Sequence, residues 1–221
     1  MSGDSDVRSL RISKLERLRE LGHDPYTFEE HPQTHTPEEV RANYSSLEGQ
    51  TVSMAGRVTA LRVMGKAAFF DITKDAQRMQ VYVKRDDVGE LLWEVFGLVD
   101  LGDIVGVTGE VFKTRTEEIS IHARDLKVLA KSLHVLPIGK EKDGQHWYGL
   151  SDVEERYRKR YLDLMSNLES REILLARSRV VSATRRFLDE RGFIEVETPI
   201  LELEAGGAAA RPFITYHNAL D

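Results

Sequence analysis

The feature that most constrains the fold of this chain is a two-residue hydrophobic period that runs from Thr51 to about Leu129. Apolar and polar residues alternate there, and glycine and aspartate mark the turns. Because successive side chains of a strand point to opposite faces, each strand can bury one face and expose the other. The pattern predicts strands at 51–61, 67–73, 79–84, 103–112 and 118–128, with a helix at 86–98.

This order of elements indicates a small closed barrel. Five strands with a helix after the third match the Greek-key barrel of the OB type. Barrels of this type commonly bind oligonucleotides, so their outward side chains are candidates for a binding face.

The alternation also predicts the orientation of side chains on the second, third and fifth strands. The apolar set is expected to point inward: Phe70, Ile72, Met79, Val81, Val83, Ile119 and Ile121. The remaining set is expected to point outward: Phe69, Asp71, Gln80, Tyr82, Glu118, Ser120 and His122. Two interpretations fit this outer face. It is either a solvated sheet with one exposed phenylalanine, or a stacking platform beside groups that read the edge of an unpaired base.

The segment before the barrel is predicted to be helical and then irregular. Leucines at near-helical spacing predict an amphipathic helix over 8–21, ended by Gly22. The connector at 23–50 contains three prolines, and a short helix is expected to begin at Thr36, a residue that can cap it.

A linker with a basic end follows the barrel. The run RYRKRY at 156–161 alternates cations with tyrosines. It can hold phosphates, but a solvated helix face with tyrosines packed inward is the favoured interpretation.

The last part of the chain returns to helical periodicity. Two apolar rows predict a broad helix over 168–190, preceded by a possible capping box from Ser166 to Glu169. A strand is expected over 193–201, with Pro199 at an edge or bend because proline cannot donate to a ladder. The helix and strand suit either a domain core or a subunit interface.

Composition narrows the class of protein. The chain has 221 residues, a formal net charge of −6 and no cysteine, so disulfides and thiolate metal sites are excluded. The first 18 residues lack the apolar core of a signal peptide, and no stretch approaches the ~20 apolar residues of a membrane helix. A cytoplasmic protein is therefore expected.

Four segments carry a resemblance to a known family. RGFIEVETP at 191–199 resembles motif 1 of the class II aminoacyl-tRNA synthetases. Around it, MGKAAFFDI at 64–72, RYRKRYLDLMSN at 156–167 and GGAAARPFITYHNALD at 206–221 are similar to bacterial class II lysyl-tRNA synthetases. The similarity extends from roughly residue 10 to the last residue.

The resemblance implies an α+β chain with a division into four parts. These are a helical extension (1–50), an OB-fold anticodon-binding domain (51–132), a linker (133–160) and the beginning of an antiparallel class II catalytic domain (161–221).

The resemblance also implies roles for individual residues. Phe69 matches the aromatic that stacks on the central anticodon uridine, Gln80 matches the amide that reads it, and Glu118 and Arg62 match nearby anticodon contacts. The strand phase turns Arg62 inward unless a bulge intervenes.

Three further positions are implied outside the barrel. Gly206 matches a glycine whose backbone contacts the lysine substrate, although Ala205 stands where the family has proline. Phe187 and Pro199 match the dimer interface.

The activity implied is that of a lysine–tRNA ligase. Its expected partners are tRNA(Lys), L-lysine, ATP with Mg²⁺, and a second subunit. Motifs 2 and 3, which hold ATP and Mg²⁺ in the family, do not occur in these 221 residues, so no catalytic or metal-binding residue is expected here and this chain alone is expected to be inactive. The alternative is a stand-alone tRNA-binding protein that uses the barrel without catalysis.

Overall fold

The computed structural model describes residues 2–137, 140–142, 145–147, 150–200 and 213–219. The chain divides into two compact units, Met1–Arg171 and Glu172–Asp221.

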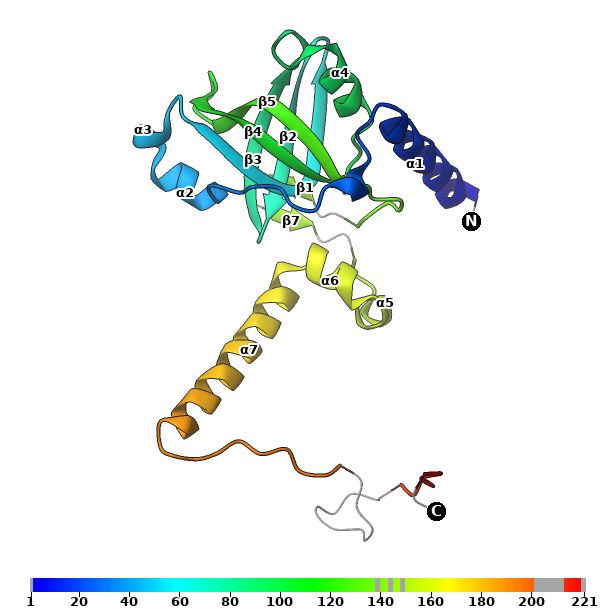
Figure 1. Cartoon of the computed structure of the whole chain (residues 1–221), viewed down its shortest axis with the longest axis vertical. Helices are drawn as coiled ribbons and strands as arrows, with labels where there is room; N and C mark the ends of the chain where they lie inside the picture. Colours follow the sequence, from blue (N-terminus) through cyan, green and yellow to red (C-terminus); the bar gives the residue numbers. More distant parts are fainter. Residues whose placement is uncertain (1, 138–139, 143–144, 148–149, 201–212, 220–221) are drawn as a thin grey trace. The chain divides into compact units, whose positions relative to one another are not determined.

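The first unit is built around a closed five-stranded barrel with the strand order β1-β2-β3-β5-β4 (Figure 1). Its strands are β1 (Thr51–Met64), β2 (Ala67–Lys74), β3 (Gln77–Lys84), β4 (Ile104–Lys113) and β5 (Ile119–Ala130). Strands β3 and β5 pair in parallel, and the other neighbours are antiparallel. Helix α4 (Arg85–Gly97) lies between β3 and β4 in the chain. The predicted OB-type barrel is thus confirmed.

The inward prediction is confirmed for six of the seven apolar side chains, which are buried: Phe70, Ile72, Met79, Val81, Val83 and Ile121. Ile119 is only partly buried and packs against this core. Helix α4 contributes Phe96, whose ring centroid lies 5.4 Å from that of Phe70. The barrel interior is therefore a packed hydrophobic core, and a ligand site must lie on its outer surface.

Two outward predictions need correction, because Asp71 and Ser120 are buried, at 6% and 0% exposure. Both residues alternate with core residues along their strands, as the predicted phase requires, but each is buried and hydrogen-bonded to a polar neighbour. Arg78 donates to the carboxylate of Asp71, and the Ser120 hydroxyl donates to Gln80. Hydrogen bonds therefore satisfy the Ser120 hydroxyl and one of the two carboxylate oxygens of Asp71.

The predicted N-terminal helix is present as α1 (Ser2–Glu20), with Gly22 at φ 76° just beyond its end. Leu15 and Leu18 are buried, whereas Leu10 is 59% exposed. Arg11 fastens the helix to the chain after the barrel, since its guanidinium donates to the carbonyls of Ser132 and His134 at 2.8 and 2.6 Å.

The connector contains three short helices: η1 (Pro25–Thr27), α2 (Pro37–Ala42) and α3 (Tyr44–Leu47). Thr36 and Glu39 form a complete capping box at the start of α2. The predicted helix beginning at Thr36 is confirmed.

After the barrel come a two-stranded sheet and three helices. These elements are β6 (Lys140–Lys142), β7 (Gln145–Trp147), α5 (Val153–Arg158), α6 (Arg160–Ser166) and α7 (Leu168–Asp189). The predicted long helix is confirmed, and Gly192 follows it at φ 79°. The capping box predicted at Ser166 is wrong, because Ser166 ends α6 and its hydroxyl donates to the Leu162 carbonyl at 2.7 Å.

The strand predicted over 193–201 is also wrong within the described residues 193–200, which adopt no regular structure. A strand exists only when its backbone groups pair with a neighbour. No such pairing occurs for these residues in the part of the chain that the structure describes.

The tyrosines of the basic run do not pack inward, as Tyr157 and Tyr161 are 70% and 65% exposed. Two of its arginines serve the fold instead: Arg156 and Arg160 donate to the buried carboxylate of Asp163 at 2.7 and 2.5 Å. Although burial opposes ionisation, hydrogen bonds from Asn167 and these arginines hold the pKa of Asp163 well below its ordinary value.

None of the helices among the described residues combines the length and the apolar character needed to cross a membrane.

Candidate nucleic-acid interface

A cavity of about 650 Å³ opens on the outer surface of the barrel. Its lining comes from the first four strands and from the turn after β4: Arg62, Met64, Ala67, Phe69, Gln80, Tyr82, Phe112, Lys113, Thr114, Arg115 and Thr116. The volume lies in the range of small-ligand pockets. Three of the four side chains expected to bind an anticodon, Arg62, Phe69 and Gln80, therefore lie together.

A β-bulge explains how Arg62 reaches this face. The register of β1 against β2 shifts between Val58 and Ala60, which turns the rest of β1 by one residue. As a result Arg62 pairs directly with Phe69 across the two strands and is exposed.

Aromatic rings form one wall of the cavity. The ring of Phe69 lies 4.9 Å from that of Tyr82, and Tyr82 lies 6.1 Å from Phe112 and 5.1 Å from His122, centroid to centroid. Such contacts restrict the orientation of each ring, and Phe69, Tyr82 and Phe112 all line the cavity. Phe112 was missed by the sequence reasoning, although it follows the inward residue Val111 and so falls on the outer face of β4.

The amide of Gln80 supplies hydrogen-bonding groups between the rings. Its oxygen accepts a hydrogen bond of 2.9 Å from the hydroxyl of Ser120. The amide NH₂ of Gln80 is thus the group left to donate to a ligand.

Glu118, the fourth predicted contact, does not line the cavity. Its carboxylate accepts from Arg78 at 2.7 Å, and Arg78 also donates to Asp71 at 3.2 Å. Asp71 Oδ1 has no hydrogen-bond partner among the described residues. Arg78 therefore bridges the carboxylate of Glu118 and the buried carboxylate of Asp71.

Cations surround the rings. Neither Arg62 nor Arg115 forms an ion pair within the described part of the chain, whereas Lys113 pairs with Glu117 at 3.0 Å. Lys113 also lies 5.0 Å from the centroid of the Tyr44 ring. The hydroxyl of Tyr44 donates a hydrogen bond to Glu48, which raises the pKa of Tyr44 to about 12. Two unpaired guanidinium groups beside stacked rings suit a phosphate backbone whose bases enter the cavity.

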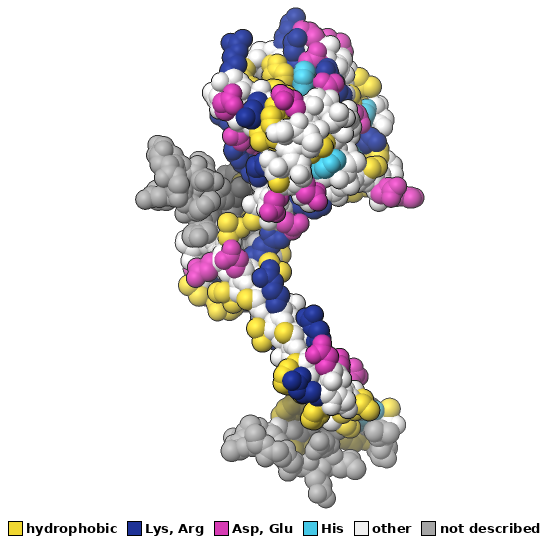
Figure 2. Space-filling model, turned by 90° about the vertical axis from the view of Figure 1, so that its left-hand side faces the viewer, with side chains coloured by type: hydrophobic (Ala, Val, Ile, Leu, Met, Phe, Trp, Pro, Cys, Tyr) yellow, Lys and Arg dark blue, Asp and Glu magenta, His cyan; other side chains and the backbone are white. Residues whose placement is uncertain are grey.

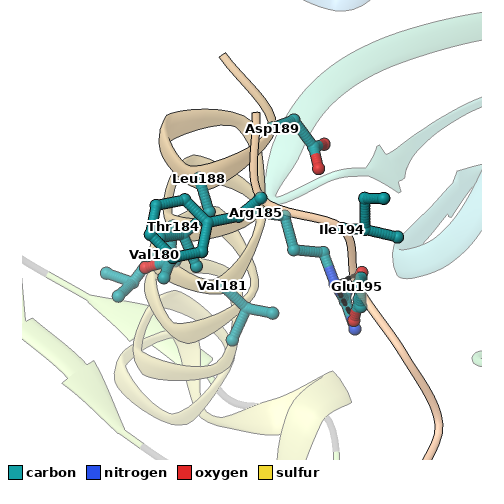
Figure 3. A pocket seen from close by; sticks show the side chains of 9 residues that line it. Val180, Val181, Thr184, Arg185, Leu188, Asp189, Ile194 and Glu195 are labelled. Atoms are coloured by element: carbon teal, nitrogen blue, oxygen red, sulfur yellow. Dashed lines mark hydrogen bonds and ion pairs between the residues drawn. The ribbon is translucent and has the colours of Figure 1, made fainter. Parts of the chain in front are cut away.

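The second unit carries the residues expected at a dimer interface. A hollow of about 420 Å³ lies between α7 and the segment that follows it, lined by Val180, Val181, Leu188, Phe193 and Ile194 among others. Figure 3 shows Arg185 reaching from α7 to Glu195, with bonds of 3.0 and 3.1 Å.

Helix α7 presents an exposed apolar surface. Figure 2 shows hydrophobic side chains along this helix, interrupted by charged ones. Phe187 is 53% exposed with the guanidinium of Arg191 stacked 3.5 Å from its ring centroid, and Pro199 is also exposed. Gly206 lies outside the described residues.

Comparison with known proteins agrees with the barrel fold. Residues 52–129 match the family of OB-fold nucleic acid binding domains of the tRNA anticodon type. The barrel thus belongs to the OB-fold class of domains that this family describes.

Residues 152–221 match the class II tRNA synthetases of the D, K and N group. Over 217 residues, or 98% of this chain, the sequence is 48% identical to a lysine–tRNA ligase of Thermoanaerobacter sp. strain X514. A lysine–tRNA ligase of Moorella thermoacetica is 47% identical over 223 residues, and one of Clostridium novyi is 48% identical over 211 residues. The chain belongs to this class II tRNA synthetase family and is homologous to its lysine–tRNA ligases. It spans 42%, 44% and 40% of the length of these three relatives.

Proposed function

We propose that the barrel binds the anticodon of tRNA(Lys) and that the protein to which these residues belong is a lysine–tRNA ligase. The observation that carries this proposal is the cavity that gathers Arg62, Phe69 and Gln80 on one face. Homology with lysine–tRNA ligases along nearly the whole chain supports the choice of tRNA.

Each side chain of the cavity has a chemical task in this proposal. Phe69, braced by Tyr82, stacks on the central uridine of the anticodon, and Gln80 hydrogen-bonds the edge of that base. Arg62 and Arg115 neutralise neighbouring phosphates. Glu118, whose carboxylate is held by Arg78, contacts an adjacent nucleotide.

The use of ATP and Mg²⁺ is proposed for the ligase as a whole, because class II synthetases depend on them. Among the described residues no group of three or more His, Asp or Glu side chains could hold a metal ion. No step of the reaction is therefore assigned to the described residues.

Two further proposals concern the second unit. Gly206 contacts the lysine substrate through its backbone, where the absence of a side chain permits close approach. Phe187 and Pro199 belong to a homodimer interface, which is consistent with the exposure of both residues.

The match of residues 152–221 to a synthetase family favours the ligase over a stand-alone tRNA-binding protein. Anticodon binding is tested by titrating the 221-residue chain with a tRNA(Lys) anticodon stem-loop and with a stem-loop of the same stem but a different anticodon. We expect clear preference for the first, and equal affinity would contradict the proposal. For the complete protein, lysine-dependent ATP–pyrophosphate exchange is expected, and its absence would exclude a lysine ligase.

A further inference from the structure

Ser120 is a fully buried polar residue in contact with the proposed base-reading amide. It lies on β5 directly opposite Gln80 of β3 in the parallel pairing of the two strands. Its hydroxyl donates to the Gln80 oxygen at 2.9 Å and lies 3.3 Å from the backbone carbonyl of Glu118. Its exposure is 0%, so it cannot touch a ligand in the cavity.

A glutamine amide can present either its oxygen or its NH₂ to a ligand, and the two ends select different partners. In this structure the oxygen is occupied by Ser120, and the NH₂ is left for the cavity that Phe69 and Tyr82 line. The opposite orientation would bring the Gln80 NH₂ to Ser120 and turn an acceptor toward the base. The partner of the Gln80 oxygen thus decides which end the ligand meets.

We infer that Ser120 is a positioning residue for base selection, which fixes Gln80 with its NH₂ toward the base and so favours uridine over cytidine. This inference rests on the proposed function. Uridine carries a carbonyl acceptor at position 4, which matches the NH₂ of Gln80. Cytidine carries an amino donor at the same position, so donor meets donor and the hydrogen bond is lost.

The first experiment compares two anticodon stem-loops, with uridine or cytidine at the central position, as ligands of the full 221-residue chain. Ser120→Ala leaves Gln80 free to turn, so we expect the ratio of uridine to cytidine affinity to fall about threefold to tenfold, the value of one hydrogen bond. Ser120→Thr keeps the hydroxyl and is expected to retain most of the ratio.

A matched control tests whether removal of any buried hydroxyl lowers the ratio of uridine to cytidine affinity. Ser53 on β1 is also buried, and its hydroxyl donates to the Pro32 carbonyl at 2.7 Å, away from the cavity. Ser53→Ala is expected to lower the melting temperature and leave the affinity ratio unchanged. If Ser120→Ala behaves in the same way, Ser120 is only structural and the inference fails.

A second variant leaves Ser120 and its packing intact. Gln80→Glu replaces the NH₂ by an oxygen, so an acceptor now faces the base whichever oxygen Ser120 holds. The preference is expected to shift from uridine toward cytidine, even if the added negative charge weakens binding of both stem-loops. An unchanged preference would mean that the Gln80 oxygen already faced the base, which overturns the inference.

The outcomes separate this inference from the proposed function. If the unaltered chain binds neither stem-loop, anticodon recognition by the barrel is wrong and the role of Ser120 falls with it. If the unaltered chain prefers uridine and the Ser120 and Gln80 variants keep that preference, anticodon recognition stands and only the positioning role is overturned.

Discussion

Two adjacent phenylalanines show how much depends on strand phase at the scale of single residues. Phe69 lines the outer cavity beside Tyr82, whereas Phe70 is 1% exposed and packs in the barrel core. The same side chain therefore has opposite tasks at consecutive positions.

The first prediction compares alanine substitutions at these two positions. Phe69→Ala removes base stacking worth roughly 1–3 kcal/mol and is expected to weaken stem-loop binding about tenfold to a hundredfold without unfolding the barrel. Phe70→Ala is expected to destabilise the fold by about 3–5 kcal/mol. Titration and thermal melting of both variants check this. Wild-type affinity for Phe69→Ala, or early melting of that variant alone, would contradict the assignment of faces.

The second prediction concerns His31, which joins the connector to the barrel. Its ring contacts Gly106, where an added Cβ would lie 2.6 Å from the ring, and its Nε2 lies 3.1 Å from the Ser53 hydroxyl. Burial and the charge of Lys127 lower the pKa of His31, with Asp125 opposing. The unfolded chain therefore binds a proton before the folded one, and stability is expected to fall as pH decreases below about 6.5.

His31→Gln removes this titration and serves as the comparison. The melting temperature of the unaltered chain is expected to drop more steeply between pH 7 and pH 5 than that of the variant. Parallel curves would exclude a contribution from His31.

Where strand phase alone determines which way a side chain points, the sequence predicted the face of single residues correctly. Phe69, Gln80 and Tyr82 occur on the expected face and line the cavity. The link from Ser120 to Gln80 could not be predicted, since it depends on the register of two strands that are 40 residues apart in the chain.

At the scale of elements, the barrel strands were predictable because each one buries a continuous face within the first unit. The segment 193–200 has an equally strand-like sequence but no regular structure, because a strand needs a partner that alternation alone cannot supply. The sequence could show only that Arg62 would point outward if a bulge intervened. It could not predict the register shift after Val58 itself, because a bulge leaves no clear signal in a single sequence.

The third prediction tests the pairing of β4 with β5. Gly109 pairs with Ala123 beside a register shift, and a Cβ there would overlap the backbone carbonyl oxygen of His122. Gly109→Ala must therefore separate the strands and is expected to cost about 1–3 kcal/mol or more. Gly97 at the end of α4 has open space around it, so Gly97→Ala is expected to be neutral or stabilising by up to about 1 kcal/mol.

Chemical denaturation of both glycine variants gives the comparison. If Gly109→Ala is as stable as Gly97→Ala, the close approach of β4 to β5 at this point is wrong.

At the scale of the whole molecule, the two units differ in how completely they bury their apolar residues. The first has a continuous core, from Leu18 of α1 to Val128 of β5. In the second, Ile173, Val180 and Phe187 on α7 are 61%, 65% and 53% exposed. Rows of exposed apolar side chains of this size are typical of surfaces that pair with another protein, and a second copy of the chain is the partner in the proposed homodimer.

The last prediction is that this face causes self-association. We expect the 221-residue chain to sediment as a concentration-dependent mixture at micromolar levels. Val180→Glu places a charge in the apolar row and should shift the mixture toward monomer, because a charge buried at an interface loses its hydration. Ser182→Glu adds the same charge two positions along the helix, about 200° around its axis, and should leave association unchanged. A monomer for the unaltered chain, or equal effects of the two substitutions, would contradict an interface built on this row.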